Sequence, residues 1–444
     1  MAESSQTIAE TVEAIAEGRL TARQWTQHCL DQIASHEEIG AWSFVDQERA
    51  LEKADALDWM RQDGSAFGPL HGCPVGLKDI IEVNGMPHGC GSPLMGEVSQ
   101  SNAVLVDALE AAGAVVVGKT ETTEFATLHP SRTKNPHSLE YSPGGSSSGS
   151  AAAVASGDVP VTIGSQTNGS TIRPASYCGV YAMKPSAGII PRVGVFEQSP
   201  TLDQMGIFAN SLEDIGLVVD ALSVHDSRDP QSIAAPRPAC FEGVMADPPM
   251  EPNFAILTLP YRQLQTHACT EGFREVADAL DGRVEILECP PTFEQLIQAQ
   301  RTIHLKEAFQ AFDQLGLMGN PQLSETLQSM LTEGQSFTDS QYDEALEIRD
   351  SLSGFFDNFF EDFDAILSPS ASGEAPLLSE GHTGNPVFCT VWTLAGLPCL
   401  NLPILQGEHG LPIGVQMIGR RKDDARLLRT ARWFMTTLFD EGES

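Results

Sequence analysis

The sequence predicts an α/β fold, because helical and strand-like segments alternate along most of the chain. An amphipathic helical segment over residues 102–112 is stopped by Gly113, and the β-branched run AVVVGKT follows at once. The same alternation returns over residues 254–360, where the apolar pieces FAILTL and RVEILE lie between long helical stretches. Helix followed by buried strand, repeated in this way, is typical of helices packed on a central sheet.

The first half of the chain begins with a helical region. Residues 7–62 are helical in pattern, and Thr21 is predicted to cap a helix with apolar positions at helical spacing. Residues 66–84 change to strand character. A Gly/Ser-rich stretch then opens residues 141–187, which continue into the strand-like segment VPVTIGS, and a helix is expected near residues 211–222.

The second half starts after a predicted loop. Residues 227–252 carry six prolines and few apolar runs, so we expect them to join two halves of the fold. The terminal segments FDAILSPS, VWTLAGLPCLNLPI and GLPIGVQMIGR are predicted to return to strands. DDARLLRTARWFMTTL is predicted to be a closing helix, and we find no internal repeat.

The charge of the chain excludes two classes of partner. Among 444 residues, 60 are acidic and 26 are basic, which gives a net charge of −34. So acidic a chain is repelled by phosphate backbones and anionic lipid surfaces, so we expect neither nucleic-acid nor membrane binding. The charge instead indicates a strongly solvated surface, of the kind suited to a saline medium. The length suits two or three domains, or a single unit built on one large sheet.

The cysteines predict free thiols. There are nine, an odd number, with wide spacing and no C-x-x-C pair, which argues against a disulfide framework or a zinc site. The N-terminal stretch has no basic start followed by an apolar core, and no apolar run approaches the roughly 18 residues of a membrane span. These features predict a cytoplasmic protein.

A nucleotide-binding motif is present by pattern alone. Residues 113–120, GAVVVGKT, match G-x-x-x-x-G-K-[ST]. The middle residues favour extended strand, and the segment follows a helix instead of opening one. We therefore interpret it as a strand.

Two serine-containing turns are better candidates for chemistry. GGSSSGS over residues 144–150 could be a flexible linker, but it leads directly into the small-residue helical stretch AAAVASG. Ser170 lies 24 residues after Ser146, and the strand VPVTIGS between the two turns could bring both serines to one sheet edge.

A serine nucleophile needs a base, and Lys78 is a candidate. None of the eleven histidines has a context that singles it out. Lys78 lies among apolar residues in CPVGLKDII, where loss of hydration would lower its pKa toward the neutral form. The alternative is a structural salt bridge to Asp79. Lys119 and Lys184 are rival bases.

At these residues the chain resembles the amidase signature family. GGSSSGS (144–150), Gly169-Ser170, PASYCG (174–179) and Lys184-Pro185 match the family pattern, and GLKD (76–79) matches the segment around its lysine. AGAVVVGKT, WTLAGLP and GLPIGVQMIG also resemble family segments, and the resemblance is weakest over residues 226–360.

The resemblance implies a mechanism. Lys78 would deprotonate Ser146, whose peptide bond is cis in the family, and Ser146 would relay the proton from the nucleophile Ser170. The backbone N–H groups of Thr167, Asn168, Gly169 and Ser170 would form the oxyanion hole. No metal and no organic cofactor is implied.

The resemblance also implies the architecture. We expect an α/β/α domain with a mixed, twisted sheet of about eleven strands covered by helices. Residues 1–444 would form this single domain, divided into N-terminal helices (1–65), a signature core (66–225), a variable helical insert (226–360) and a C-terminal return to the sheet (361–444).

Two departures bear on the branch of the family. Members commonly place Asp four residues before the nucleophile and Arg two residues after it, whereas here those positions are Gln166 and Ile172, and arginine follows at Arg173. Loss of both charges together is coherent, because one alone would be buried unpaired. Asn168 replaces the usual glycine. The S-x-I-R-P sequence favours a free-standing amidase over the A chain type of an aminoacyl-tRNA amidotransferase.

The predicted function is hydrolysis of an amide, urea or carbamate bond in a small molecule. The alternatives are a component of a glutamine-dependent amidotransferase and a catalytically dead binding module. Arg173, Gln166 and Met95 are predicted to bind substrate, and Arg173 could clamp a carboxylate or else pack outward against an acidic residue. A homodimer is an open alternative to a monomer.

Overall fold

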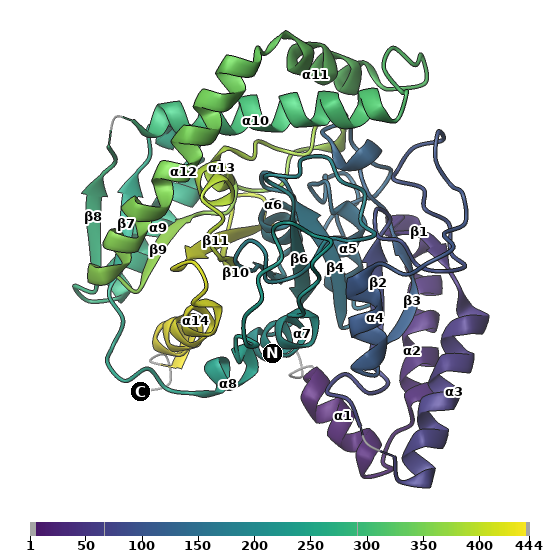
Figure 1. Cartoon of the computed structure of the whole chain (residues 1–444). Coiled ribbons are helices and arrows are strands. Elements are labelled where there is room, and N and C mark those ends of the chain that lie inside the picture. Colours follow the sequence, from purple (N-terminus) through teal and green to yellow (C-terminus); the bar gives the residue numbers. More distant parts are fainter. Residues whose placement is uncertain (1–5, 66, 291, 441–444) are drawn as a thin grey trace.

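Eleven strands of the described residues form one mixed sheet through the middle of the molecule (Figure 1). The computed structural model describes residues 6–65, 67–290 and 292–440. In their order across the sheet, the strands are β1 (Trp42–Val45), β3 (Val115–Thr120), β2 (Pro74–Lys78), β4 (Val161–Gln166), β6 (Gln204–Ala209), β5 (Tyr181–Lys184), β10 (Cys399–Gln406), β11 (Pro412–Ile418), β9 (Ala365–Pro369), β7 (Phe254–Thr258) and β8 (Val284–Glu288).

Parallel and antiparallel pairs both occur in the sheet. Strands β3, β2 and β4 are parallel, as are β9, β7 and β8, whereas the strands from β4 through β6, β5, β10 and β11 to β9 pair antiparallel. The inner strands β2, β3 and β4 are buried along their whole length, as expected for strands covered on both faces. The predicted α/β fold with about eleven mixed strands is therefore confirmed.

Helices cover the sheet, and three long ones lie across one end of it, at the top of Figure 1 (α10, α11 and α12). The helices are α1 (Ile8–Ala16), α2 (Ala22–Ser35), α3 (Gln47–Asp63), α4 (Val104–Ala111), α5 (Ser148–Ala155), α6 (Ile172–Cys178), α7 (Leu212–Leu222), α8 (Cys240–Met245), α9 (His267–Ala279), α10 (Phe293–Gln314), α11 (Glu325–Ser336), α12 (Asp339–Asp362), α13 (Val387–Leu394) and α14 (Asp424–Asp440). The two short helices α5 and α6 start beside the sheet edge to which the serine turns belong.

Several local predictions are confirmed. Helix α4 ends before Gly113, whose φ of +92° suits glycine, and strand β3 follows it. Thr21 caps α2 through a capping box completed by Gln24. The nucleotide-motif segment is an interior strand, paired with β1 and β2. Helices α7 and α14 also form as expected.

Three local predictions are wrong. Strand β1 interrupts the region 7–62, because four residues at a sheet edge are too few to break the helical periodicity around them. Helix α13 includes VWTL, which we predicted as strand; residues 388–394 are buried on every side, so no amphipathic pattern marks them as helical. The loop 227–252 contains the short helix α8.

The segment 226–360 is not wholly helical, since it contributes β7 and β8 to the sheet. The outermost residues of the predicted domain, 1–5 and 441–444, lie outside the described residues, as does residue 66, where strand character was predicted to begin. The division of the domain into four segments stays an interpretation.

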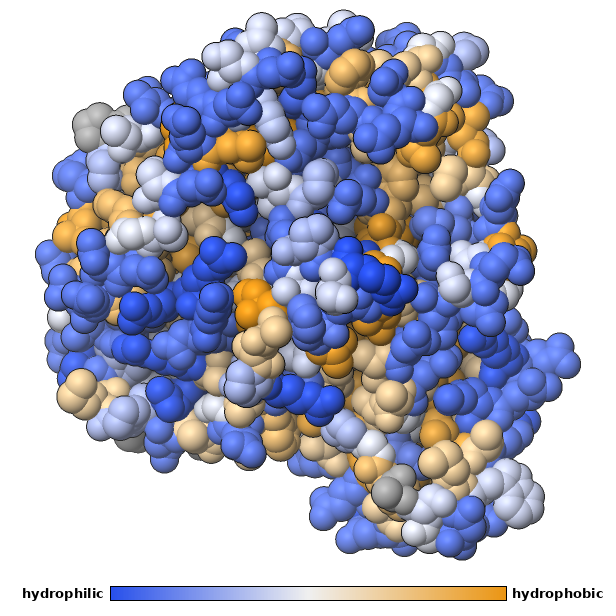
Figure 2. All heavy atoms as spheres, viewed as in Figure 1, coloured by the Kyte–Doolittle hydropathy of each residue, from blue (hydrophilic) through white to orange (hydrophobic). Residues whose placement is uncertain are grey.

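The surface and the cysteines agree with the composition. Hydrophilic residues cover most of the face seen in Figure 2. All nine cysteines are free, and all except Cys289 are buried. In the described part of the chain, no helix combines the length and the apolar character needed to cross a bilayer.

Candidate active site

Lys78 ends strand β2 in the interior of the protein. The strand is buried throughout because neighbouring strands and helices cover both of its faces, and the exposed fraction of Lys78 is 0%. Its Nζ donates hydrogen bonds to Ser146 Oγ at 2.7 Å and to Ser165 Oγ at 2.8 Å. No carboxylate of the described residues forms a salt bridge with it. An amine held only by hydroxyl groups in this way can act as a base.

Burial lowers the pKa of Lys78 to about 7, although the negative charge of Asp203 opposes this shift. Removing an ammonium from water disfavours its charged form, and two neutral hydroxyls do not restore what is lost. A substantial fraction of Lys78 is therefore neutral near pH 7.

The rival lysines are held differently. Lys119 forms a buried salt bridge with Asp79 at 2.9 Å, so Asp79 is the partner of Lys119 and not of Lys78. Lys184 donates to Gln204 Oε1 and to two backbone carbonyls. Of these three lysines, Lys78 is the one bonded to serine hydroxyls.

Ser146 lies in a turn just before helix α5. The Gly145–Ser146 peptide bond is cis, as the resemblance led us to expect. The carbonyl of Ser146 accepts hydrogen bonds from Thr122 Oγ1 and from the backbone N–H of Thr123, and its side chain is 1% exposed. The residue is thus fixed on both sides, with its hydroxyl toward Lys78.

Ser170 lies in the turn between strand β4 and helix α6. The backbone N–H of Ser147 donates to the carbonyl of Ser170 at 3.4 Å, which joins the two serine turns. Ser170 is partly exposed and lines a cavity. The backbone N–H groups of residues 168–170 make no hydrogen bond to any other described residue, so they remain available to a developing oxyanion.

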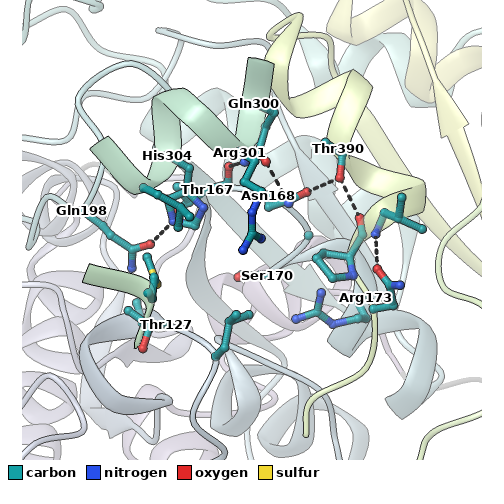
Figure 3. A pocket seen from close by; sticks show the side chains of 18 of the residues that line it. Thr127, Thr167, Asn168, Ser170, Arg173, Gln198, Gln300, Arg301, His304 and Thr390 are labelled. Atoms are coloured by element: carbon teal, nitrogen blue, oxygen red, sulfur yellow. Dashed lines mark hydrogen bonds between the residues drawn. The ribbon is translucent and has the colours of Figure 1, made fainter. Parts of the chain in front are cut away.

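Two helices hold the turn through Asn168. Its side chain donates to Gln300 Oε1 of α10 and accepts from Thr390 Oγ1 of α13 (Figure 3). Thr393 of α13 donates to its backbone carbonyl at 2.5 Å. The residue that replaces a family glycine therefore ties the turn to α10 and α13.

Gln166 lies behind the turn. Its Oε1 accepts hydrogen bonds from the backbone N–H groups of Thr171 and Ile172 at 2.9 and 3.0 Å, and its Nε2 donates to Thr393. It satisfies N–H groups that the start of helix α6 leaves without partners. Gln166 does not line the cavity.

Arg173 is 2% exposed and directs its guanidinium into the cavity beside Ser170 (Figure 3). Nη2 donates to the carbonyl of Gly145 at 2.7 Å and to Thr383 Oγ1 at 3.3 Å, whereas Nε and Nη1 have no partner among the described residues. No described carboxylate pairs with Arg173, so the alternative of an outward ion pair is wrong. Burial lowers its pKa.

The cavity has a volume of about 220 Å³ and brings together most of the predicted binding residues. Among the predicted residues, Thr167, Asn168, Gly169, Ser170 and Arg173 line it. Met95 does not: it packs against the main core. Lys78 and Ser146 lie behind the cavity wall.

The sequence reasoning missed part of the site. Ser165 alternates with buried residues on β4 and carries no signal of its own, and Gln198 lies in a loop without a motif. Helix α10 supplies Ile297, Gln300, Arg301, His304 and Leu305 to the wall, from the region where the resemblance is weakest. Burial and the nearby Arg301 lower the pKa of His304 to about 4, so it is neutral near pH 7.

The described residues include no cluster of three or more His, Cys, Asp or Glu side chains that could hold a metal ion. Two hydroxyls, a lysine with a lowered pKa and a turn with free N–H groups are the parts needed for acyl transfer through a serine.

Comparison with known proteins places the chain. Residues 24–428 match the family described as Amidase. The A-type component of the glutamyl-tRNA(Gln) amidotransferase from Chloroflexus aggregans is 32% identical over 95% of this chain and 94% of its own length. The same component from a Cyanothece species is 30% identical over 93% of this chain and 94% of its own.

Solved structures agree with this placement. The native peptide amidase from Stenotrophomonas maltophilia is 26% identical, with a TM-score of 0.86 over 98% of this chain and 97% of that one. A structure reported as an unexpected vestigial protein complex, revealing the origins of an s-triazine catabolic enzyme, is 28% identical, with a TM-score of 0.91 over 98% and 99% of the two chains. The chain therefore belongs to the amidase signature family and is a hydrolase of carbon–nitrogen bonds other than peptide bonds.

Proposed function

We propose that the chain hydrolyses the amide bond of a small acidic molecule through an acyl-enzyme on Ser170. Ser170 Oγ attacks the carbonyl carbon while its proton passes to Ser146, and the proton of Ser146 passes to neutral Lys78. The tetrahedral intermediate collapses when the C–N bond breaks and the leaving nitrogen takes a proton back along this path. Water then attacks the acyl-enzyme by the same route and releases the acid.

One observation carries this proposal: a lysine buried without a carboxylate partner donates 2.7 Å and 2.8 Å hydrogen bonds to two serine hydroxyls. A structural lysine in such a position would be expected to pair with an anion, as Lys119 does with Asp79. The pKa of about 7 gives Lys78 the driving force of a general base at neutral pH.

The turn after β4 supports oxyanion stabilisation. The backbone N–H groups of residues 168–170 lie in a turn fixed by α10 and α13, so they would need no reorganisation during the reaction. One such donor typically contributes roughly 3–4 kcal/mol to lowering the barrier.

The charge of the cavity supports an acidic substrate. Arg173 offers two unpartnered nitrogens, and Arg301 also lines the cavity, whereas no Asp or Glu does in a chain with 60 acidic residues. A substrate carboxylate would satisfy the buried guanidinium and gain charge-assisted hydrogen bonds. Half-amides of short dicarboxylic acids have this chemistry.

A serine-directed probe and a matched substrate pair test the proposal. A fluorophosphonate should label wild-type protein at Ser170 and leave Ser170→Ala unlabelled. The half-amide of a dicarboxylic acid should have a higher kcat/KM than the neutral diamide of the same acid. Full labelling of Ser170→Ala would overturn the nucleophile, and a preference for the diamide would overturn the substrate class. Failure of the wild type to react with any probe or amide would favour a dead binding module.

A component of an amidotransferase is the second candidate, because the A-type components of glutamyl-tRNA(Gln) amidotransferases are similar to this chain over nearly its whole length. Glutamine is also an amide with a carboxylate, so it fits the same chemistry. In that case hydrolysis of glutamine by the isolated chain should be slow and should rise when a partner protein is added. Rapid turnover of a half-amide by the isolated chain favours the free-standing amidase.

A further inference from the structure

Asp203 is a buried carboxylate just before strand β6, close to the catalytic groups but not among them. Its Oδ1 accepts a 2.6 Å hydrogen bond from Thr167 Oγ1, and its Oδ2 accepts from the backbone N–H groups of Gln198 and Ser199 at 2.8 and 2.9 Å. It forms no salt bridge with another described residue, and the nearby Arg192 pairs with Asp229. An unpaired buried carboxylate is costly unless its hydrogen bonds are needed.

These hydrogen bonds join two separate parts of the cavity wall. Thr167 opens the turn that carries Ser170, and Gln198 lines the opposite side of the cavity, where its side chain reaches His304 of α10 (Figure 3). Without Asp203, the described contacts would leave the Thr167 side chain and the backbone N–H of Gln198 without these partners.

Helix α10 holds the same two parts from the other side. Gln300 Nε2 donates to the carbonyl of Thr167 at 3.3 Å, and Glu307 accepts from the hydroxyls of Ser199 and Thr201. The turn and the loop 198–203 are therefore fixed between α10 and the carboxylate of Asp203. A small rotation of the turn would move the free N–H groups away from an oxyanion, and an error of about 1 Å can cost roughly a hundredfold in rate.

Asp203 also acts on Lys78 by its charge. A second small cavity, of about 10 Å³, is lined by Asp203 and by Ser165, the hydrogen-bond partner of Lys78. The negative charge of Asp203 raises the pKa of Lys78 against the effect of burial, and burial raises the pKa of Asp203 to about 6. The other titratable groups around this pair are Arg192, Asp229, Glu197, Glu307 and Cys90.

We propose that Asp203 is a positioning residue for the reaction, which holds the Ser170 turn to the opposite wall of the cavity through Thr167, Gln198 and Ser199. The proposal rests on the function proposed above for Ser170 and adds a group outside the catalytic set. Its carboxylate never touches substrate; it keeps the oxyanion-binding turn in place and leaves a negative charge near the base.

Substitution of Asp203 by Asn tests the proposal against a matched control, Asp214→Asn. Asp214 is another buried carboxylate with a pKa raised to about 6, but it accepts from Ile8 N and Ser211 Oγ at the start of α7 and does not line the cavity. We expect Asp203→Asn to lower kcat roughly 10- to 100-fold with little change in KM. It should also move the acid limb of the pH profile to lower pH, because loss of the negative charge lowers the pKa of Lys78. Asp214→Asn should change neither.

Two variants of Thr167 keep the test decisive if Asp203→Asn does not fold. Thr167→Val removes the hydroxyl that binds Asp203 and should lower kcat about tenfold without moving the acid limb, whereas Thr167→Ser keeps the hydroxyl and should retain activity. Wild-type kcat and pH profile in Asp203→Asn, or wild-type kcat in Thr167→Val, would overturn the proposal. Probe labelling of Ser170 in the same wild-type sample reports separately on the proposed function.

Discussion

Arg173 Nη2 donates a 2.7 Å hydrogen bond to the carbonyl oxygen of Gly145, the residue before Ser146. The group proposed to bind a substrate carboxylate thus also holds the turn that carries the proton relay. The remaining nitrogens, Nε and Nη1, have no partner among the described residues and face the cavity. Substrate recognition and the geometry of the relay therefore depend on one side chain.

Replacement of Arg173 by Met should weaken binding of acidic amides more than that of neutral ones. Loss of charge-assisted hydrogen bonds worth about 1.5–3 kcal/mol predicts a rise in KM of roughly ten- to a hundredfold for the half-amide. Because the Gly145 contact is lost as well, kcat should fall for both substrates. The measurement is the ratio of kcat/KM for the half-amide and the diamide in both proteins, and an unchanged ratio would exclude the clamp.

Arg301 provides the matched control for charge. It also lines the cavity, but it is exposed and pairs with Glu333 of α11 through two hydrogen bonds. Since solvent screens such a pair, Arg301→Met should change the substrate ratio by no more than a few fold. A larger effect for Arg301 than for Arg173 would place the anion-binding group at the mouth of the cavity.

The catalytic set should behave as a unit. Ser170→Ala and Lys78→Met should each reduce kcat at least about a thousandfold, and the double variant should be little worse than either alone. Ser146→Ala should be severe but can leave residual turnover if water relays the proton. Single-turnover rates for the four proteins test this, and multiplicative losses in the double variant would contradict a shared role.

The competition between Lys78 and its neighbours explains what the sequence could predict. From residues alone, a salt bridge between Lys78 and Asp79 was as reasonable as a catalytic role. Successive residues at the end of a strand point in different directions, so Asp79 meets Lys119 from the adjacent strand β3 while Lys78 meets the serines. The motif resemblance identified the correct lysine, but only the strand pairing gives the reason.

The missed parts of the site have a common physical cause. Helix α10 contributes much of the cavity wall, yet it lies more than 120 residues after Ser170 in sequence, where no motif marks it. Met95, chosen by position in the resemblance, packs into the core instead. The overall α/β order was predictable because periodicity is local, whereas the composition of the cavity depends on tertiary contacts that local patterns do not encode.

Gln166 should affect stability, not substrate choice. Replacement by Leu leaves the backbone N–H groups of Thr171 and Ile172 without an acceptor in the interior, at a cost of about 1–3 kcal/mol each. We expect a lower free energy of unfolding and a lower kcat, with an unchanged ratio of kcat/KM for the half-amide and the diamide. Gln295→Leu, on the exposed surface of α10, should alter stability by no more than about 0.5 kcal/mol. A changed substrate ratio in Gln166→Leu would restore its predicted contact with substrate.

The pH dependence of turnover should report on Lys78. The base must be neutral to accept a proton, so activity should be lost as pH falls through its pKa of about 7. With a neutral amide as substrate, kcat/KM should fall about tenfold per pH unit below that midpoint and reach a plateau above it. Lys78→Arg should show no rise at any accessible pH, because a guanidinium stays protonated. His304 lines the cavity with a pKa of about 4, so His304→Gln should keep the midpoint near 7. A midpoint near 4 in the wild type that disappears in His304→Gln would assign the base to the histidine and remove Lys78 from that role.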